Sequence, residues 1–257
     1  MIRLEIRGIK IGSLVEETEK KYTYLGIFPD KNPVIIKSAK SSDDNETLLN
    51  EVKWFEKLRT FNEEVERHSK KIGVEYHFDW LFAWLVTTFV EPNQDDRRFS
   101  VFSMPETEIS KLIPLSKVAR TTQIDSRTSV WILERIFKFY AYFELMRESG
   151  DIPLTEYPVF SSRDYLLGPV QHRLIYYNYS GSGMDFTAYE LVKTITTFIK
   201  GWVVLSQEAE DKKYGYMLDD FSQKGRKSFV EAHGELQKTA KELWGTKYYP
   251  FTFRNLN

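Results

Sequence analysis

Two residues of opposite charge, Lys37 and Glu51, lie in segments whose patterns indicate a strand and the inward face of a helix. Lys37 follows three branched apolar residues in the short run 34–39 (VIIKSA), which is typical of a strand. Apolar residues then recur at helical spacing: Leu48, Val52, Phe55 and Leu58. Glu51 shares their side of the helix, where an unpaired carboxylate would cost several kcal/mol. We therefore expect Glu51 to take a cation as its partner.

The residues that the chain lacks or scatters exclude other kinds of chemistry. There is no cysteine, which excludes disulfides, thiolate zinc sites and cysteine nucleophiles. The 4 histidines are scattered without the spacing of metal ligands, and the serine pair at 161–162 does not form a G-x-S-x-G elbow. Glycine occurs only 13 times, and neither common glycine-rich phosphate-binding pattern is present. Zinc chemistry, serine hydrolysis and the common nucleotide loops are therefore disfavoured.

Length and charge bound the class of protein. The 257 residues, 42% apolar and 28% charged, suit one large domain or two lobes that share a core. Lys and Arg number 36 against 37 Asp and Glu, so the net charge of −1 disfavours nucleic acid as a partner. The most apolar run, 80–90, is far shorter than the roughly 20 residues of a membrane-spanning helix. The N-terminus alternates apolar and charged residues, unlike a signal peptide. We expect a cytoplasmic protein without a membrane partner.

The first half of the chain predicts a β-rich region with one helix. Strands are expected over 3–14, 21–28, 34–39, 76–90 and 98–104. The first three form an antiparallel meander, and Lys37 lies in its third strand. A helix is expected from about 45 to 61 and carries Glu51, and the highly charged stretch 62–71 continues it or forms a surface loop.

The second half predicts mainly helices around one small hairpin. A connector is expected over 105–111, followed by a long helix over 126–148 with a wide apolar face. Short strands at 165–167 and 174–177 form a hairpin. The remainder is expected to be helical, with helices over 186–205 and 227–244.

The order of these elements resembles the two-lobed protein-kinase fold. The run 34–37 (VIIK) is similar to the V-A-I-K strand of protein kinases. The segments 24–26 (YLG) and 44–51 (DNETLLNE) are similar to the Y-L-G and D-N-D-L-x-x-N-E motifs of divergent kinase-like proteins from actinobacteria and cyanobacteria. The ending 244–251 (WGTKYYPF) is similar to the Y-G-P-R-x-F-x-P-F ending of that group. The chain is thus expected to be a bacterial or phage kinase-like protein.

The resemblance implies roles for four residues. Lys37 falls at the lysine that contacts ATP phosphates, and Glu51 at the glutamate that pairs with it. In active kinases an Asn before the hairpin and an Asp after it hold magnesium. Here Asp164 stands at the Asn position and Asn178 at the Asp position, so the two oxygen ligands are exchanged in type. The implied cofactors are ATP and Mg²⁺, the metal held by Asp164 and Asn178.

Three other parts of the kinase machinery are missing. The catalytic base would fall at Val159, which cannot accept a proton from a substrate hydroxyl. The glycine-rich loop would fall at 17–21 (ETEKK), where two glutamates repel phosphate and no glycine allows close approach. No A-P-E motif follows Asn178. This combination is typical of a pseudokinase.

The predicted architecture is α+β: one kinase-like domain over 1–257. It has a small antiparallel β-rich N-lobe with helix C (1–104), a connector (105–109) and a mainly helical C-lobe (110–257). The predicted function is that of a pseudokinase-like protein, which binds a protein partner, and in one reading a nucleotide, instead of transferring phosphate.

Three alternatives stay open on the sequence alone. In the first, the chain is an active atypical Ser/Thr kinase that uses Asp164 and Asn178 for metal-bound ATP. In the second, it is a purely structural interaction module with a collapsed cleft. The third concerns single residues: Lys37 and Glu51 are a structural ion pair, and Asp164 and Asn178 are turn-forming residues.

Overall fold

The computed structural model describes residues 5–71, 78, 81–104, 112–148, 157–168, 173–179, 182–183, 187–245 and 253–255. The chain divides into two compact units. The first consists of Met1–Glu63, His77–Pro114 and Tyr165–Tyr179, and the second of Glu64–Tyr76, Leu115–Asp164 and Ser180–Asn257. The hairpin after residue 164 is therefore grouped with the N-terminal strands. The expected connector 105–109 lies outside the described residues.

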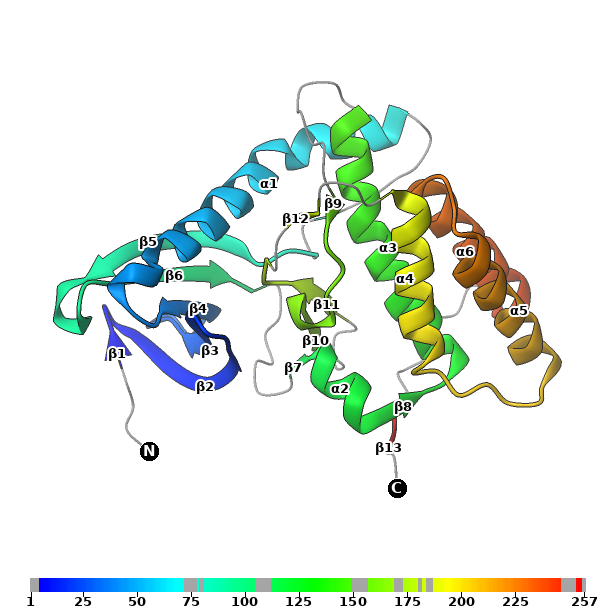
Figure 1. Cartoon of the computed structure of the whole chain (residues 1–257), viewed down its shortest axis with the longest axis horizontal. Helices are drawn as coiled ribbons and strands as arrows, with labels where there is room; N and C mark the ends of the chain where they lie inside the picture. Colours follow the sequence, from blue (N-terminus) through cyan, green and yellow to red (C-terminus); the bar gives the residue numbers. More distant parts are fainter. Residues whose placement is uncertain are drawn as a thin grey trace. The chain divides into compact units, whose positions relative to one another are not determined.

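A six-stranded antiparallel sheet is the largest part of the first unit (Figure 1). In spatial order its strands are β1 (Glu5–Ile6), β2 (Ile9–Glu17), β3 (Lys21–Ile27), β4 (Pro33–Ala39), β6 (Arg97–Ser103) and β5 (Trp84–Glu91). The expected single strand over 3–14 is divided in two, because Arg7 and Gly8 both have positive φ. That conformation suits a two-residue hairpin turn, and Ile6 pairs with Ile9 across it.

The sheet curls around its own apolar core. Six buried side chains form this core: Ile6, Ile9, Val34, Ile36, Phe99 and Val101. Although β1 and β5 lie at opposite ends of the strand order, Arg7 Nε is 3.3 Å from Glu91 Oε2 and its guanidinium lies over the Phe89 ring. The strand order places β4, which carries Lys37, between β3 and β6 in the middle of the sheet.

The helix α1 (Asn45–Lys71) follows β4 after the short 3-10 turn η1 (Ser42–Asp44). Asn45 fixes its start, because its amide donates to Asp96 O at 2.9 Å and accepts from Arg98 N at 2.6 Å. The expected apolar face is confirmed: Leu48, Val52, Phe55 and Leu58 are all buried. The helix continues through the charged stretch 62–71, where Val65 still faces inward.

The strand expected over 76–90 is shorter than predicted. β5 begins only at Trp84, and a 3-10 turn η2 (Pro92–Gln94) follows it. Ahead of it, Phe82 forms an isolated bridge to Tyr176, and Ala83 N donates to Tyr176 O at 3.0 Å. This contact joins the large sheet to a three-stranded sheet of β7 (Ile113–Pro114), β10 (Tyr165–Gly168) and β11 (Arg173–Tyr176). The predicted hairpin is confirmed as β10 and β11.

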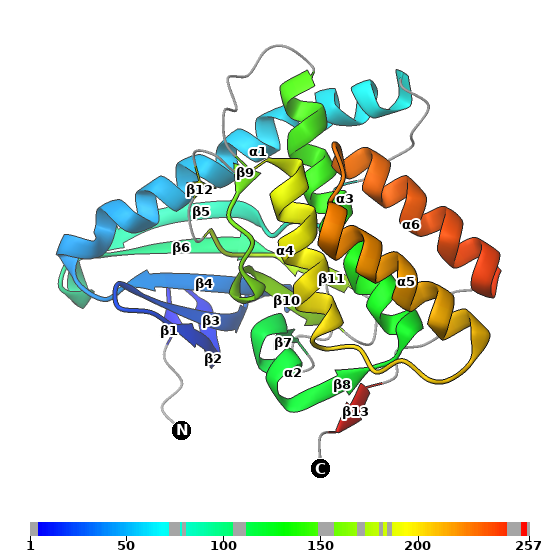
Figure 2. The same ribbon diagram turned by 45° about the vertical axis from the view of Figure 1, so that its right-hand side comes forward.

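Helices dominate the second unit (Figure 2). They are α2 (Leu115–Thr121), α3 (Ser126–Glu148), α4 (Ala188–Lys200), α5 (Ala209–Lys224) and α6 (Phe229–Trp244). Short strands accompany them: β8 (Thr122–Ile124) pairs with β13 (Phe253–Asn255), and β9 (Tyr157–Pro158) pairs with β12 (Ser182–Gly183). The 3-10 turn η4 (Ser162–Asp164) precedes β10.

Buried polar groups fix how these helices pack. α3 packs against α6, and the Glu144 carboxylate on α3 accepts from the backbone of Phe229 at 2.8 Å and of Val230 at 3.0 Å. These are free N–H groups of the first turn of α6, so one side chain both caps a helix and joins two. The predicted helix 126–148 is confirmed without a shift of its ends. The helix expected over 186–205 ends at Lys200, before Gly201 and Trp202.

None of the helices in the described part of the chain is both long enough and apolar enough to cross a membrane.

Candidate functional site

The structure brings Lys37 and Glu51 together in the first unit. β4 holds Lys37 in register between Thr23 of β3 and Ser100 of β6, so its side chain leaves the sheet at a defined point. Glu51 lies on the first half of α1. The Lys37 ammonium donates to Glu51 Oε1. Both side chains are buried, with relative exposures of 0% and 3%, so the pair is formed away from water.

The Lys37 ammonium has acceptors for all three of its protons. Besides Glu51, it donates to the Tyr177 carbonyl at 2.5 Å and to Asn178 Oδ1 at 3.4 Å. The rings of Phe102 and Phe55 lie 4.9 Å and 5.5 Å from it, respectively. A lysine ammonium has three donors, so these contacts saturate it. Aromatic faces add favourable cation–π contacts around the charge.

A second lysine, Lys21, completes the cluster, and the sequence patterns above do not single it out. Lys21 begins β3, and its ammonium donates to Glu51 Oε2 at 2.9 Å and to Asn178 Oδ1 at 2.5 Å. Its residue exposure is only 7%. The signal that could have found it is the alternation of β3, in which Lys21, Thr23 and Leu25 share the buried face.

Asn178 and Glu16 close the cluster on its remaining side. Asn178 Nδ2 donates to Glu16 Oε2 at 3.3 Å, and the Tyr177 hydroxyl donates to the same oxygen at 3.4 Å. The backbone N–H of Tyr179 donates to Glu51 Oε1 at 3.0 Å. Both ammonium groups bond to Glu51, and Glu16 joins the cluster through Asn178 and Tyr177. The formal charges of the two lysines and two glutamates cancel.

The two lysines lower the pKa of Glu51. Burial alone raises the pKa of a carboxyl group, because it disfavours the charged form. Here the charges of Lys21 and Lys37, together with their hydrogen bonds, outweigh burial, and the net direction is downward. Glu51 is accordingly ionised at neutral pH, and its negatively charged carboxylate lies between the two ammonium groups.

A tight turn stands between β2 and β3, directly before Lys21. Thr18 N donates to Lys21 O at 2.9 Å, and Thr18 Oγ1 accepts from Lys21 N at 3.1 Å. Nearby, Lys40 Nζ lies 2.5 Å from Glu17 Oε1. The Thr18 side chain thus holds the backbone that delivers Lys21 to the cluster.

Comparison with known proteins identifies similar folds and assigns no family. No family model and no curated protein sequence matches the chain. Among solved structures, vaccinia related kinase 3 aligns with a TM-score of 0.56 at 10% identity, over 94% of this chain and 91% of that one. The PknI kinase domain from Mycobacterium tuberculosis gives 0.50 at 10% identity, over 93% and 98%. An apo pseudokinase gives 0.51 at 11% identity, over 88% and 90%.

The chain has a protein kinase-like fold. An antiparallel sheet with its long helix, followed by a mostly helical C-terminal part, confirms the predicted fold class. At identities near 10% the likeness concerns the fold and leaves activity to be argued from the site.

Asp164 and Val159 belong to the second unit of this kinase-like fold. Asp164 ends η4, directly before β10, and is buried with a relative exposure of 1%. Its backbone N–H donates to Ser161 O at 3.0 Å. Val159 is partly buried, just after β9. Asp164 thus belongs to a different unit from Lys37, Glu51 and Asn178, which the first unit brings together.

The donor set around Asn178 does not fit a magnesium site. The oxygen that would bind the metal, Oδ1, already accepts from Lys21 and Lys37. Mg²⁺ requires oxygen ligands at about 2.0–2.1 Å in octahedral geometry, and ammonium groups supply none. Within the described ranges there is also no group of three or more His, Cys, Asp or Glu side chains that could hold a metal ion.

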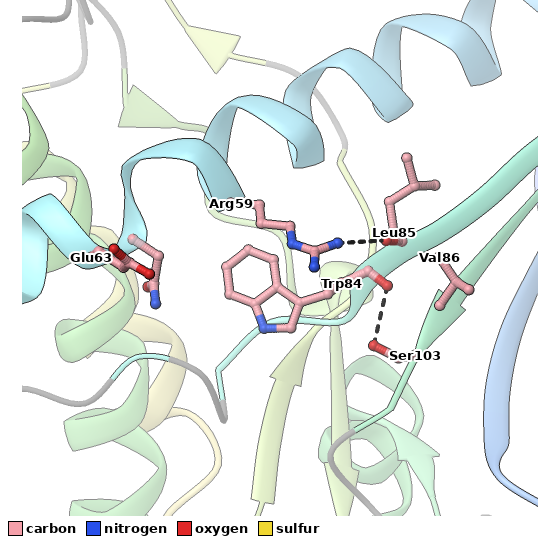
Figure 3. A pocket seen from close by; sticks show the side chains of 7 residues that line it. Arg59, Glu63, Trp84, Leu85, Val86 and Ser103 are labelled. Carbon is pink, nitrogen blue, oxygen red and sulfur yellow. Dashed lines mark hydrogen bonds between the residues drawn. The ribbon is translucent and has the colours of Figure 1, made fainter.

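A pocket of about 530 Å³ opens elsewhere on the first unit, between α1 and β5 (Figure 3). Its lining residues are Arg59, Asn62, Glu63, Trp84, Leu85, Val86 and Ser103. Figure 3 shows the Arg59 guanidinium beside the Trp84 ring, with one N–H donating to Leu85 O at 3.3 Å. Val86 lies where the β5–β6 register shifts, and it is 50% exposed. No sequence motif singles out any of these residues.

Proposed function

We propose that this kinase-like chain acts by binding a protein partner and does not transfer phosphate. The observation that carries the proposal is the saturation of Lys37. Its three donors bond to Glu51, to the Tyr177 carbonyl and to Asn178 Oδ1, and the side chain has no exposed surface. An ATP phosphate would have to displace one of these buried acceptors before it reached the ammonium.

Two further features support the proposal. The turn held by Thr18 replaces a glycine-rich loop, and a side chain at this place keeps backbone N–H groups away from phosphate. Val159 offers no proton acceptor where the resemblance puts the catalytic base. Phosphoryl transfer relies on positioning and charge neutralisation, and both would have to be supplied by other groups.

One structural neighbour adds a precedent for the fold. The structure that aligns at a TM-score of 0.51 is that of a pseudokinase in its apo state. Its 11% identity relates the folds and not the sites. We take it as support for a kinase-like fold that serves a role other than catalysis.

An active atypical Ser/Thr kinase is the alternative that a specific observation favours. Lys37 and Glu51 already form the ion pair that active protein kinases need. In that reading Asp164 and Asn178 would hold metal-bound ATP after the Lys21 contact had opened. The third reading is a purely structural interaction module, in which the closed cluster is permanent and no nucleotide binds.

Thermal shift and phosphate transfer separate these readings. We expect no transfer of labelled phosphate from ATP, and no rise in Tm with ATP and Mg²⁺. A rise in Tm that Lys37→Met abolishes would show that the protein binds nucleotide as well as its protein partner. Transfer that Asp164→Ala abolishes, while Asp43→Ala retains it, would overturn the proposal in favour of the kinase.

We place the contact with the protein partner at the pocket of Figure 3. Val86 and Trp84 supply an apolar wall, and Arg59 uses only one N–H within the described part of the chain. A guanidinium with open donors binds carboxylates well. Because Glu63 also lines the pocket, the segment that fits is a peptide of the partner that directs an acidic side chain at Arg59 and an apolar one at Val86.

Site-specific cross-linking tests this placement. A photoreactive amino acid is introduced at Val86 and, as control, at Tyr216 of α5, which is 71% exposed. The proposal expects one protein that is cross-linked from the first position and not the second, and that is lost when Arg59→Glu is added. Cross-links that do not change with Arg59→Glu would contradict it.

A further inference from the structure

Lys21 is buried in a way that lysine side chains rarely are. Lysine is almost never fully buried unless it is paired, and Lys21 has 7% residue exposure. Its ammonium bridges two groups from distant parts of the chain, Glu51 Oε2 on α1 and Asn178 Oδ1 just after β11. A carboxylate and an amide oxygen are also the ligands that a hard divalent cation prefers. The ammonium thus lies between two oxygen atoms of the kind that could ligate a cation in its absence.

The geometry at Asn178 Oδ1 leaves no room for a divalent cation in addition to the Lys21 ammonium. Lys21 Nζ lies 2.5 Å from this oxygen and Lys37 Nζ lies 3.4 Å from it. A carbonyl-type oxygen has two lone pairs, and both are directed at an ammonium. A divalent cation at about 2 Å from the same oxygen would stand against two positive charges in a site with little water to screen them.

The charge count explains why the cluster is stable as it stands. Lys21 and Lys37 contribute two positive charges, and Glu16 and Glu51 two negative ones. If a neutral residue replaced Lys21, the cluster would keep one uncompensated negative charge, and Glu51 Oε2 would lose its ammonium partner. A cation from solution could then take the place of that ammonium.

We propose that the Lys21 ammonium is the resident cation of this cluster, standing in for a divalent metal and excluding it. Lys21 is therefore the residue that determines the cation specificity of the site. The inference rests on the proposed function, since it gives the physical reason why this kinase-like chain has no use for Mg²⁺. It predicts that one neutral substitution converts the cluster into a divalent cation site.

Mn²⁺ binding followed by electron paramagnetic resonance tests the proposal without any assay of activity. Lys21→Met is compared with wild type and with Lys40→Met, which removes a nearby lysine whose side chain is 26% exposed. We expect Lys21→Met to bind Mn²⁺ at least tenfold more tightly than the other two proteins. In chelator its Tm should fall by roughly 5 °C, because one buried charge has lost a partner, and Mn²⁺ should restore much of the loss.

A second pair of variants keeps the proposal testable if Lys21→Met does not fold. Asn178→Asp adds a carboxylate while Lys21 remains, and it should bind Mn²⁺ no better than wild type, because the ammonium pairs with the new charge. Asn178→Asp together with Lys21→Gln should bind Mn²⁺ at least tenfold more tightly. Tight Mn²⁺ binding by wild type or by Asn178→Asp alone would overturn the inference.

The outcomes for the two proposals are distinguishable. Phosphate transfer by the wild-type chain would contradict the proposed function. Failure of the folded Lys21→Met variant to bind Mn²⁺ would contradict only the role of Lys21 as resident cation. An effect of Lys40→Met equal to that of Lys21→Met would show general loss of positive charge and would likewise overturn the inference.

Discussion

Lys21 Nζ donates to Asn178 Oδ1 at 2.5 Å, across a sequence separation of 157 residues. The contact joins the first residue of β3 to the segment that follows the small hairpin. Glu51 Oε2, 2.9 Å from the same ammonium, adds α1 to the connection. Sheet, helix and hairpin of the first unit thus meet at one charged cluster, and the stability of that unit should depend on it.

Glu51→Gln should destabilise the protein strongly. The amide would leave the buried ammonium groups of Lys21 and Lys37 without their shared counter-charge. Breaking one partner out of a buried ion pair typically costs about 3–5 kcal/mol. For a chain of this size that corresponds to a fall in Tm of roughly 10 °C, measured by calorimetry.

The matched control is Glu63→Gln, an exposed glutamate on the same helix. Surface substitutions of this kind change the free energy of unfolding by no more than about 0.5 kcal/mol. Equal effects of the two substitutions would mean that the charge cluster contributes no special stability.

Acid should reduce this contribution of Glu51. Its pKa in the folded protein lies below the ordinary value of 4.5, because Lys21 and Lys37 outweigh the effect of burial. The unfolded chain therefore binds the proton first, and the stabilisation is present in full above pH 4.5 and lost as the pH falls through the lower, folded value. Urea unfolding between pH 7 and 3 should show the difference between wild type and Glu51→Gln shrinking on acidification. A difference that is constant with pH would contradict the pKa direction.

Two glycines of the second unit should respond to alanine with opposite signs. Gly225 has φ of 64° and ψ of −165°, and a Cβ there would lie 2.5 Å from the Tyr189 carbonyl oxygen. Gly225→Ala should therefore cost about 2–3 kcal/mol. Gly234, inside α6, has nothing within 4 Å of such a Cβ, so Gly234→Ala should stabilise by up to about 1 kcal/mol. Thermal unfolding of both variants provides the check, and a shared sign would refute the argument.

Local patterns predict the elements that carry Lys37 and Glu51, and the kinase resemblance predicts that the two residues pair. The branched apolar run before Lys37 indicated a strand, and the helical spacing of Val52 and Phe55 placed Glu51 on a buried face. These signals lie within a few residues of the groups they position. The same holds for α3, whose wide apolar face predicted both of its ends.

The rest of the cluster depends on partners that are remote in sequence. Lysine is most often exposed, so the alternation that placed Lys21 beside Thr23 carried little weight against its charge. Asn178 was predicted as a metal ligand from its position in the hairpin, and its bond to an ammonium follows only from how β3 and β11 are brought together. The late start of β5 has a similar cause, because Ala83 pairs with Tyr176 instead of continuing the strand.

Lys138 on α3 should destabilise the protein at neutral pH. Burial, together with the neighbouring charge of Arg135, lowers its pKa to about 8, although Glu134 and Glu66 act in the opposite direction. Below pH 8 both the folded and unfolded chains carry the proton, and the folded state bears the cost of the buried charge. As the pH rises from about 8 towards 10.5, the folded state releases the proton first and this cost disappears.

Lys138→Met should therefore raise Tm at pH 7, and the gain should shrink above pH 8. The exposed residue Lys213 provides the control, since Lys213→Met removes the same charge from the surface of α5. Lys138→Met that lowers Tm at pH 7 would show that contacts of the ammonium outweigh its burial.

Restoring the missing base should not restore phosphate transfer. Val159→Asp supplies a carboxylate where the kinase resemblance puts the proton acceptor, but a base acts only on a substrate aligned with a bound, charge-neutralised phosphate. In this chain Lys37 is saturated by Glu51, the Tyr177 carbonyl and Asn178, so the phosphate position is closed before the base is needed. We expect Val159→Asp to transfer labelled phosphate from ATP no faster than wild type, with Val159→Asn as the uncharged control. Transfer that appears in Val159→Asp alone, and disappears when Asp164→Ala is added, would mean that the cluster opens to admit ATP and that the loss of the base was the only defect.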